Sequence, residues 1–172
     1  MNADCARELL KHGVDPNRCG PKKIPPLVSA LRCAYEDDGV LFDLLIEYGA
    51  KMEPNLFFSA IVWSRADTAF KTRFLLAKSL DPNTTSAECG TPFHCAVRLA
   101  NEEVVRILLD AGADHTARAE CKQFRDKDPA ELAELQHDIR GPCMQGTYKS
   151  ILQILVDAQA GRTSSKRNRH QT

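Results

Sequence analysis

The stretch Thr91-Pro92-Phe93-His94-Cys95-Ala96-Val97, followed by Val104-Val105-Arg106-Ile107-Leu108-Leu109-Asp110-Ala111-Gly112, decides the fold of this chain. Thr91 is a good helix N-cap, and Pro92 suits the first helical position, where its missing N–H costs nothing. Apolar residues recur at helical spacing in both halves, and Gly112 can adopt the left-handed conformation that ends a helix. The sequence therefore predicts two consecutive helices, each too short to be stable alone.

The end of this unit returns elsewhere, which indicates an internal repeat. Residues 108–114 read LLDAGAD, residues 9–17 read LLKHGVDPN, and residues 75–83 read LLAKSLDPN. Four alanines at equivalent places in the units lie roughly 33 residues apart, which is a period typical of a helical repeat array. They are Ala30, Ala60, Ala96 and Ala133. Because neighbouring units bury each other's apolar faces, a short helix pair becomes stable only within such an array.

Residues 91–116 resemble an ankyrin repeat, whose signature T-P-L-H-x-A opens the first of two short helices. The resemblance implies an all-α fold, a solenoid of stacked antiparallel helix pairs, over residues 1–161. We expect a leading half-unit followed by four full units and a basic, disordered tail. The boundaries are 1–17 for the half-unit, about 22–53, 54–83, 88–118 and 125–161 for the units, 137–147 for an insertion in the last unit, and 162–172 for the tail.

Several positions depart from the family pattern. Ser79 and Gln159 stand where the other second helices have a terminating glycine, and Lys71 and Thr72 replace apolar residues of the best-matching unit. The leading half-unit has no polar helix to cover its apolar face, as the end of an array normally has. We therefore expect the chain to be a piece of a longer array or a shortened gene product.

The composition excludes several classes of function. The chain has 23 basic and 23 acidic residues, a balance that argues against binding nucleic acid or a membrane surface. Its apolar runs are too short to span a bilayer, and the N-terminus lacks an apolar signal core. The seven cysteines, with no C-x-x-C pair, are typical of reduced thiols. These features predict an intracellular, cytoplasmic protein, with the nucleus as an alternative that the basic tail suggests.

No pattern of residues predicts catalysis, a metal or a cofactor. His94 and Cys95 are adjacent in sequence, so on a helix they point about 100° apart and cannot act as a pair. We expect His94 instead to fill the histidine position of the signature, which in ankyrin repeats bonds to backbone of a neighbouring loop. The residues expected to serve the structural motif are Thr91, Pro92, His94, Ala96 and Gly112.

The resemblance implies a non-catalytic module that binds other proteins through its loop tips and first-helix face. We expect a monomer or a part of a longer array, with the partner unidentified. The candidate partner-binding residues are charged, amide or aromatic side chains at the predicted tips and first-helix ends: Lys22, Lys23, Tyr35, Trp63, Glu88, Gln123, Phe124 and Arg125. Two alternatives stay open: a regulatory segment of a larger multidomain protein, or a nuclear adaptor directed by the basic tail.

Overall fold

The computed structural model of this protein describes residues 3–20, 23–34, 39–63 and 67–168. In these ranges the chain forms nine α-helices and no strand. They are α1 (Ala3–Lys11), α2 (Pro26–Cys33), α3 (Val40–Glu47), α4 (Asn55–Trp63), α5 (Thr68–Ala77), α6 (Pro92–Arg98), α7 (Glu102–Asp110), α8 (Pro129–Ile139) and α9 (Pro142–Asn168). The chain divides into two compact units, residues 1–80 and 81–172, which we call unit 1 and unit 2.

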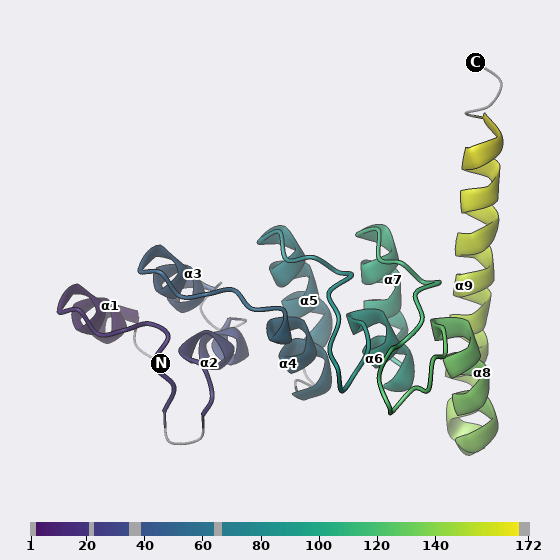
Figure 1. The fold of residues 1–172 in the computed structure, drawn as a ribbon, viewed down its shortest axis with the longest axis horizontal. Helices are drawn as coiled ribbons and strands as arrows, with labels where there is room; N and C mark the ends of the chain where they lie inside the picture. Colours follow the sequence, from purple (N-terminus) through teal and green to yellow (C-terminus); the bar gives the residue numbers. More distant parts are fainter. Residues whose placement is uncertain (1–2, 21–22, 35–38, 64–66, 169–172) are drawn as a thin grey trace. The chain divides into compact units, whose positions relative to one another are not determined.

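Unit 1 consists of the single helix α1 followed by two helix pairs, α2 with α3 and α4 with α5 (Figure 1). The first helices α2 and α4 pack on each other, and α1 packs on α3. An aliphatic and phenylalanine core fills the space between them. Its most completely buried members include Leu31, Phe42, Leu56, Phe57 and Leu75. Helix α1, which lies within the predicted half-unit 1–17, precedes the first pair and packs on its second helix, α3.

Unit 2 repeats this plan with the pairs α6 with α7 and α8 with α9. First helix α6 packs on first helix α8, and second helix α7 packs on second helix α9. Tyr148 of α9 is fully buried, and its hydroxyl donates a hydrogen bond of 3.0 Å to the carbonyl oxygen of Arg98 at the end of α6. Both units are therefore built from stacked helix pairs, and the prediction of an all-α repeat fold is confirmed.

The repeated Leu-Leu phrase forms the same helix end four times. After α1, α3, α5 and α7, a residue with positive φ is followed by a backbone hydrogen bond to the carbonyl five residues earlier, which is the Schellman arrangement. The positive-φ residues are Gly13, Gly49, Ser79 and Gly112. Ser79 thus occupies the glycine position in the left-handed conformation, with φ of 64°. The phrase recurs because α1, α3, α5 and α7 all end in this way.

The substituted positions of α5 stay inside the fold. Lys71 is 5% exposed, and Thr72 is completely buried. The Thr72 hydroxyl donates a hydrogen bond of 2.8 Å to the carbonyl oxygen of Thr68, one turn earlier. Burial of a hydroxyl is tolerated here because its donor is satisfied within the helix itself.

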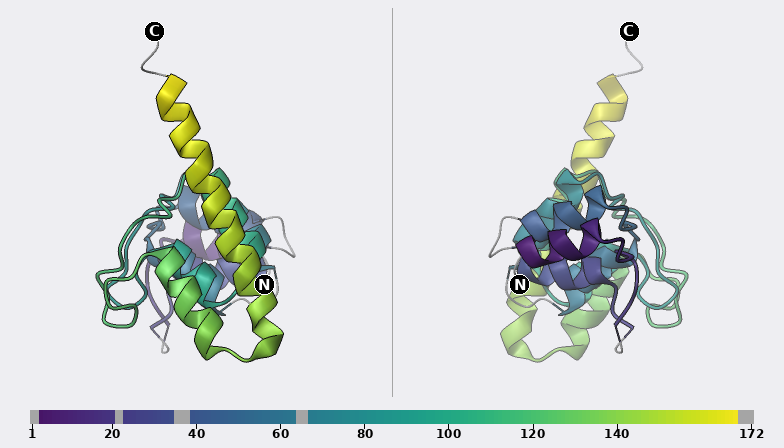
Figure 2. Two further views of the ribbon diagram at one scale, coloured as in Figure 1. Left: turned by 90° about the vertical axis from the view of Figure 1, so that its right-hand side faces the viewer. Right: turned by 90° about the vertical axis from the view of Figure 1, so that its left-hand side faces the viewer.

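The C-terminal part departs from the predicted pattern. Residues 137–147, expected to form an insertion, instead lengthen α8 through Ile139 and begin α9 at Pro142, leaving a short turn at Arg140 and Gly141. Helix α9 then passes through Gln159, where the other second helices stop. Residues 162–168, for which the sequence predicts a disordered tail, continue this helix, which extends well past α8 (Figure 2), and residues 169–172 lie outside the described part. Each residue added to an existing helix gains a backbone hydrogen bond without a new nucleation cost.

Candidate protein-binding surface

The loops that precede the first helices of unit 2 form two tips, residues 83–90 and residues 118–128. The first tip is closed by a short antiparallel bridge in which Ser86 and Gly90 exchange backbone hydrogen bonds of 2.7 and 3.0 Å. Gly90 has a φ of +65°, and a Cβ there would lie 3.0 Å from the Cβ of Ala119 in the second tip. Glycine therefore permits both the turn and the close approach of the two tips.

The second tip folds back on itself through its own backbone. The amide of Ala119 donates to the carbonyl of Lys127, and the amide of Asp126 donates to the carbonyl of Ala119, both at 3.1 Å. Arg125 and Asp126 complete the turn with positive φ values of 48° and 59°. The side chains of Gln123 and Arg125 are exposed at its end.

His94 connects α6 to the second tip. Its Nδ1 lies 2.8 Å from the Thr91 hydroxyl and accepts a 3.3 Å hydrogen bond from the Thr91 amide, completing a capping box at the start of α6. Its Nε2 lies 3.0 Å from the carbonyl oxygen of Lys127, 33 residues later. Because that oxygen can only accept, Nε2 carries the proton and the ring is neutral. The ring thus bonds to backbone of the neighbouring loop, as the resemblance implies.

The environment of His94 keeps the ring neutral. The side chain is fully buried, and burial lowers the pKa of His94 below its usual value. The bond to the Lys127 carbonyl and the charge of Asp128 act in the opposite direction but less strongly. A second proton, on Nδ1, would also break the hydrogen bond from the Thr91 amide. His94 is therefore a fixed structural group.

Phe124 lies in the same cluster and is 3% exposed. Its ring stacks on the His94 imidazole, with centroids 5.7 Å apart and planes inclined by 13°. Phe124 is one of the predicted partner-binding residues, but its ring is buried, because the chain turns back at Arg125 and Asp126 and places the ring under the tip. Phe124 instead holds the tip against α6.

Arg118 braces the second tip from the other side. Its guanidinium donates to the Asp126 carbonyl oxygen at 2.9 Å and to both carboxylate oxygens of Glu131 at 3.2 and 3.0 Å. Glu131 also accepts a 3.0 Å bond from the amide of Asp128, as part of the capping box of α8. The start of α8 and the tip are therefore one bonded structure.

The predicted partner-binding residues divide into three groups. Glu88, Gln123 and Arg125 have exposed side chains on the tips of unit 2, and Lys23 is exposed on the loop before α2 in unit 1. Trp63 is the last residue of α4, and its side chain is not among those described. Lys22 and Tyr35 lie outside the described residues.

The predicted motif residues lie in the frame beneath the tips. Thr91, Pro92 and Ala96 are buried in or beside α6, and Gly112 ends α7 with a φ of 81°. Cys95 is completely buried next to His94, and its thiol lies 3.6 Å from the carbonyl oxygen of Cys89. Burial, with a smaller contribution from Cys89, raises the pKa of the Cys95 thiol far above its usual value, which makes the group unreactive.

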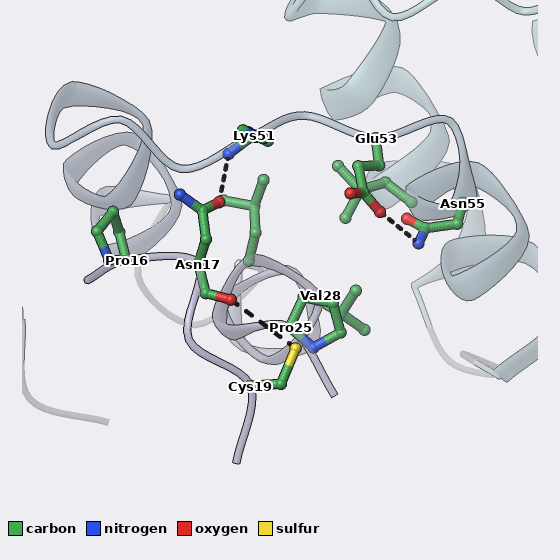
Figure 3. A pocket seen from close by; sticks show the side chains of 10 residues that line it. Pro16, Asn17, Cys19, Pro25, Val28, Lys51, Glu53 and Asn55 are labelled. Carbon is green, nitrogen blue, oxygen red and sulfur yellow. Dashed lines mark hydrogen bonds between the residues drawn. The ribbon is translucent and has the colours of Figure 1, made fainter. Parts of the chain in front are cut away.

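Unit 1 contains a cavity that sequence reasoning missed. It opens between the loop before α2 and the start of α4, with a volume of about 270 Å³ (Figure 3). The Asn17 side chain fixes one wall: it donates to the Gly49 carbonyl at 3.0 Å and accepts from the Lys51 amide at 2.9 Å. A signal was available, because the phrase Asp-Pro-Asn occurs at residues 15–17 and again at residues 81–83. In unit 2, Asn83 likewise accepts from the Asp114 amide, at 2.7 Å.

The described residues contain no group of three His, Cys, Asp or Glu side chains placed to hold a metal ion. Free thiols are present at Cys5, Cys19, Cys89, Cys95, Cys121 and Cys143. No helix in the described ranges is long and apolar enough to cross a membrane.

Comparison with known proteins agrees with this architecture. Residues 57–109, from α4 to α7, match the sequence model of a family described as ankyrin repeats (many copies). No curated protein matches the chain.

Proposed function

We propose that this chain, of which residues 57–109 match the ankyrin-repeat model, binds partner proteins through its exposed loop tips and the adjoining first-helix faces. Ankyrin repeats are in general modules for protein–protein interaction, and the family is typically not enzymatic. The proposal extends this general role to particular residues of this chain, Glu88, Gln123 and Arg125 in unit 2 and Lys23 in unit 1.

One observation carries the proposal: the tips of unit 2 combine exposed ends with a buried, fully bonded base. Arg125 and Gln123 are exposed, whereas Phe124 between them is buried against His94. A loop held in this way loses little conformational freedom when it binds, so more of the contact energy appears as affinity. Side chains presented by a rigid scaffold are typical of binding loops.

The experiment is capture of partners from a cell lysate with the full chain, compared with a variant that reverses two tip charges, Glu88→Lys and Arg125→Glu. Both side chains are exposed, so the fold should persist, and circular dichroism checks this. We expect the tip variant to lose the specific partners, with affinity for a purified partner about tenfold weaker or more. A matched control is Lys149→Glu, an exposed charge on α9 away from the tips.

Two results would contradict the proposal. One is that the wild-type chain captures nothing above the background of an unrelated protein of equal size. The other is that the tip variant and the Lys149→Glu control capture the same partners equally well, which would place the binding surface elsewhere.

A further inference from the structure

The cavity of unit 1 is large enough to hold one or two side chains of a partner protein. It lies where the loop before α2 meets the first turns of α2 and α4 (Figure 3). Pockets that hold whole small molecules usually measure roughly 300–1,000 Å³, and this one measures about 270 Å³. A cavity of this size, open to the surface, suits one or two side chains of an extended segment.

The floor of the cavity is apolar. It is formed by Leu27, Val28 and Leu56, each no more than 4% exposed, with Pro16 and Pro25 at the sides. Pro25 precedes α2 and forms no side-chain capping bond. An apolar floor at an opening favours an apolar occupant, because such a group leaves water on entering.

The walls are fixed before anything binds. The amide of Asn17 donates to the Asp15 carboxylate at 2.8 Å, while the Asn17 side chain bonds to backbone at Gly49 and Lys51. On the other side, Asn55 donates to the Glu53 carboxylate at 3.0 Å. A preformed cavity does not have to be ordered at the moment of binding.

Positive charge borders the opening. Lys51 lines the cavity, and Arg18 and Lys23 are exposed on the loop beside it. No acidic group in the described part of the chain forms an ion pair with any of these three. Two carboxylates also lie nearby, Glu53 in the lining and Asp15 on the loop, and the hydrogen bonds that they accept from Asn55 and Asn17 leave their charge in place. The three cations outnumber these two carboxylates, so the local charge favours an acidic partner over a basic one.

We propose that this cavity binds an extended segment of a partner protein in which one apolar side chain, of the size of valine, leucine or proline, is flanked by aspartate or glutamate. The inference rests on the proposed function and names the partner chemistry for unit 1. The apolar side chain enters above Val28, and the flanking carboxylates meet Lys51 and the loop cations.

The test uses fluorescent ten-residue peptides with a central leucine, valine or proline and either acidic, neutral amide or basic flanks, titrated against the full chain. We expect the acidic-flanked peptides to bind at least about tenfold more tightly than the basic-flanked ones, and the preference to weaken with salt. Lys51→Glu should lower the affinity for acidic peptides about tenfold. Lys149→Glu, the matched control on α9, should leave it unchanged.

Cys19 provides a second readout without mutation, because its exposed thiol lines the cavity. Saturating acidic peptide should slow alkylation of Cys19 by iodoacetamide at least about tenfold, since a reagent cannot reach a covered thiol. Cys5 on α1 and Cys143 on α9 are also exposed and serve as internal references. Their alkylation rates should not change.

The proposal is overturned if neutral or basic flanks bind as well as acidic ones, if Lys51→Glu and Lys149→Glu behave alike, or if bound peptide leaves Cys19 unprotected. Failure here is distinguishable from failure of the proposed function. If lysate partners depend on the tips of unit 2 while acidic peptides do not bind, only this inference falls. If neither lysate proteins nor peptides bind, both fall.

Discussion

The two units differ at the position of the histidine in the first-helix motif T-P-L-H. In unit 2 it holds His94 in α6 and Glu131 in α8, and each completes a capping box and bonds to the following or preceding tip. In unit 1 the same position holds Val28 in α2, which lines a cavity, and Phe58 in α4. The histidine position therefore holds hydrogen-bonding side chains in unit 2, of which we call His94 the brace. In α2 of unit 1 it holds Val28, part of the apolar floor of the cavity.

This difference shows how a repeat can keep its fold while changing what it presents. The packing of α2 on α4 and of α6 on α8 follows the same plan, because the apolar faces of the helices are kept. A polar side chain at the histidine position fills the space under the loop with hydrogen bonds. In α2 the apolar side chain of Val28 at this position lines the cavity instead.

The largest expected effect comes from removing the brace. His94→Ala should lower the free energy of unfolding by about 3 kcal/mol, since it leaves a cavity against Phe124 and removes one of the two hydrogen bonds that the Lys127 carbonyl accepts, the other coming from the Ala119 amide. Val28→Ala, the equivalent change in unit 1, should cost about half as much, because it removes two methyl groups beside an existing cavity. Urea unfolding followed by far-ultraviolet circular dichroism measures both. Equal losses of unfolding free energy in the two variants would contradict the different roles of His94 and Val28.

Much of this fold could be predicted from sequence because its signals are local. Thr91-Pro92 specifies a helix start, Gly112 a helix end, and apolar spacing the buried face, so helix pairs and their order follow. The position of Phe124 could not be predicted, because whether a loop aromatic is exposed depends on backbone turns at Arg125 and Asp126 that the sequence does not signal strongly. The length of α9 was missed because a helix that has already formed can continue into a polar segment without a new nucleation cost.

The cavity was missed for a different reason. Its lining combines Val28, at the histidine position of α2, with a loop that Asn17 bonds to Gly49 and Lys51. Neither residue is chemically conspicuous alone.

A second prediction concerns pH and applies to unit 2. Burial lowers the pKa of His94, so the folded chain keeps this ring neutral at pH values where the unfolded chain binds a proton. The contribution is complete above the usual histidine pKa of 6.5 and is lost as the pH falls below it. The free energy of unfolding should therefore decline between about pH 7 and pH 5, and decline less steeply in His94→Gln. His12→Gln, at an exposed site on the helix end of unit 1, is the matched control for loss of one imidazole.

A third prediction tests the outer brace of the second tip. Arg118→Ala should cost only about 0.5 to 1 kcal/mol of stability, because the Arg118 and Glu131 side chains are 51% and 42% exposed and water screens their attraction. Its local effect should be clearer. Hydrogen exchange at the amides of Ala119 and Asp126 should accelerate several-fold, while exchange in α2 and α3 of unit 1 stays unchanged. Unchanged exchange at both tip amides would show that His94 and Phe124 hold the tip without help from Arg118.

The smallest expected effect concerns Ser79. It stands where α1, α3 and α7 are each followed by a glycine, although its backbone adopts the same left-handed conformation. Ser79 ends α5 in unit 1 with a φ of 64°, and Gly112 ends α7 in unit 2 with a φ of 81°, both with the same pair of backbone hydrogen bonds. A left-handed conformation costs a residue with a Cβ about 1 kcal/mol, and part of the gain from glycine is offset by its greater freedom in the unfolded chain.

Ser79→Gly should therefore stabilise the chain by about 0.5 kcal/mol. Gly112→Ser should destabilise it by a similar amount, because a Cβ there meets no atom within 4 Å and the cost is conformational alone. Thermal and urea unfolding of the two variants would measure this. If Ser79→Gly instead lowers stability, the serine hydroxyl contributes to the helix end, and the two units stop their second helices by different means.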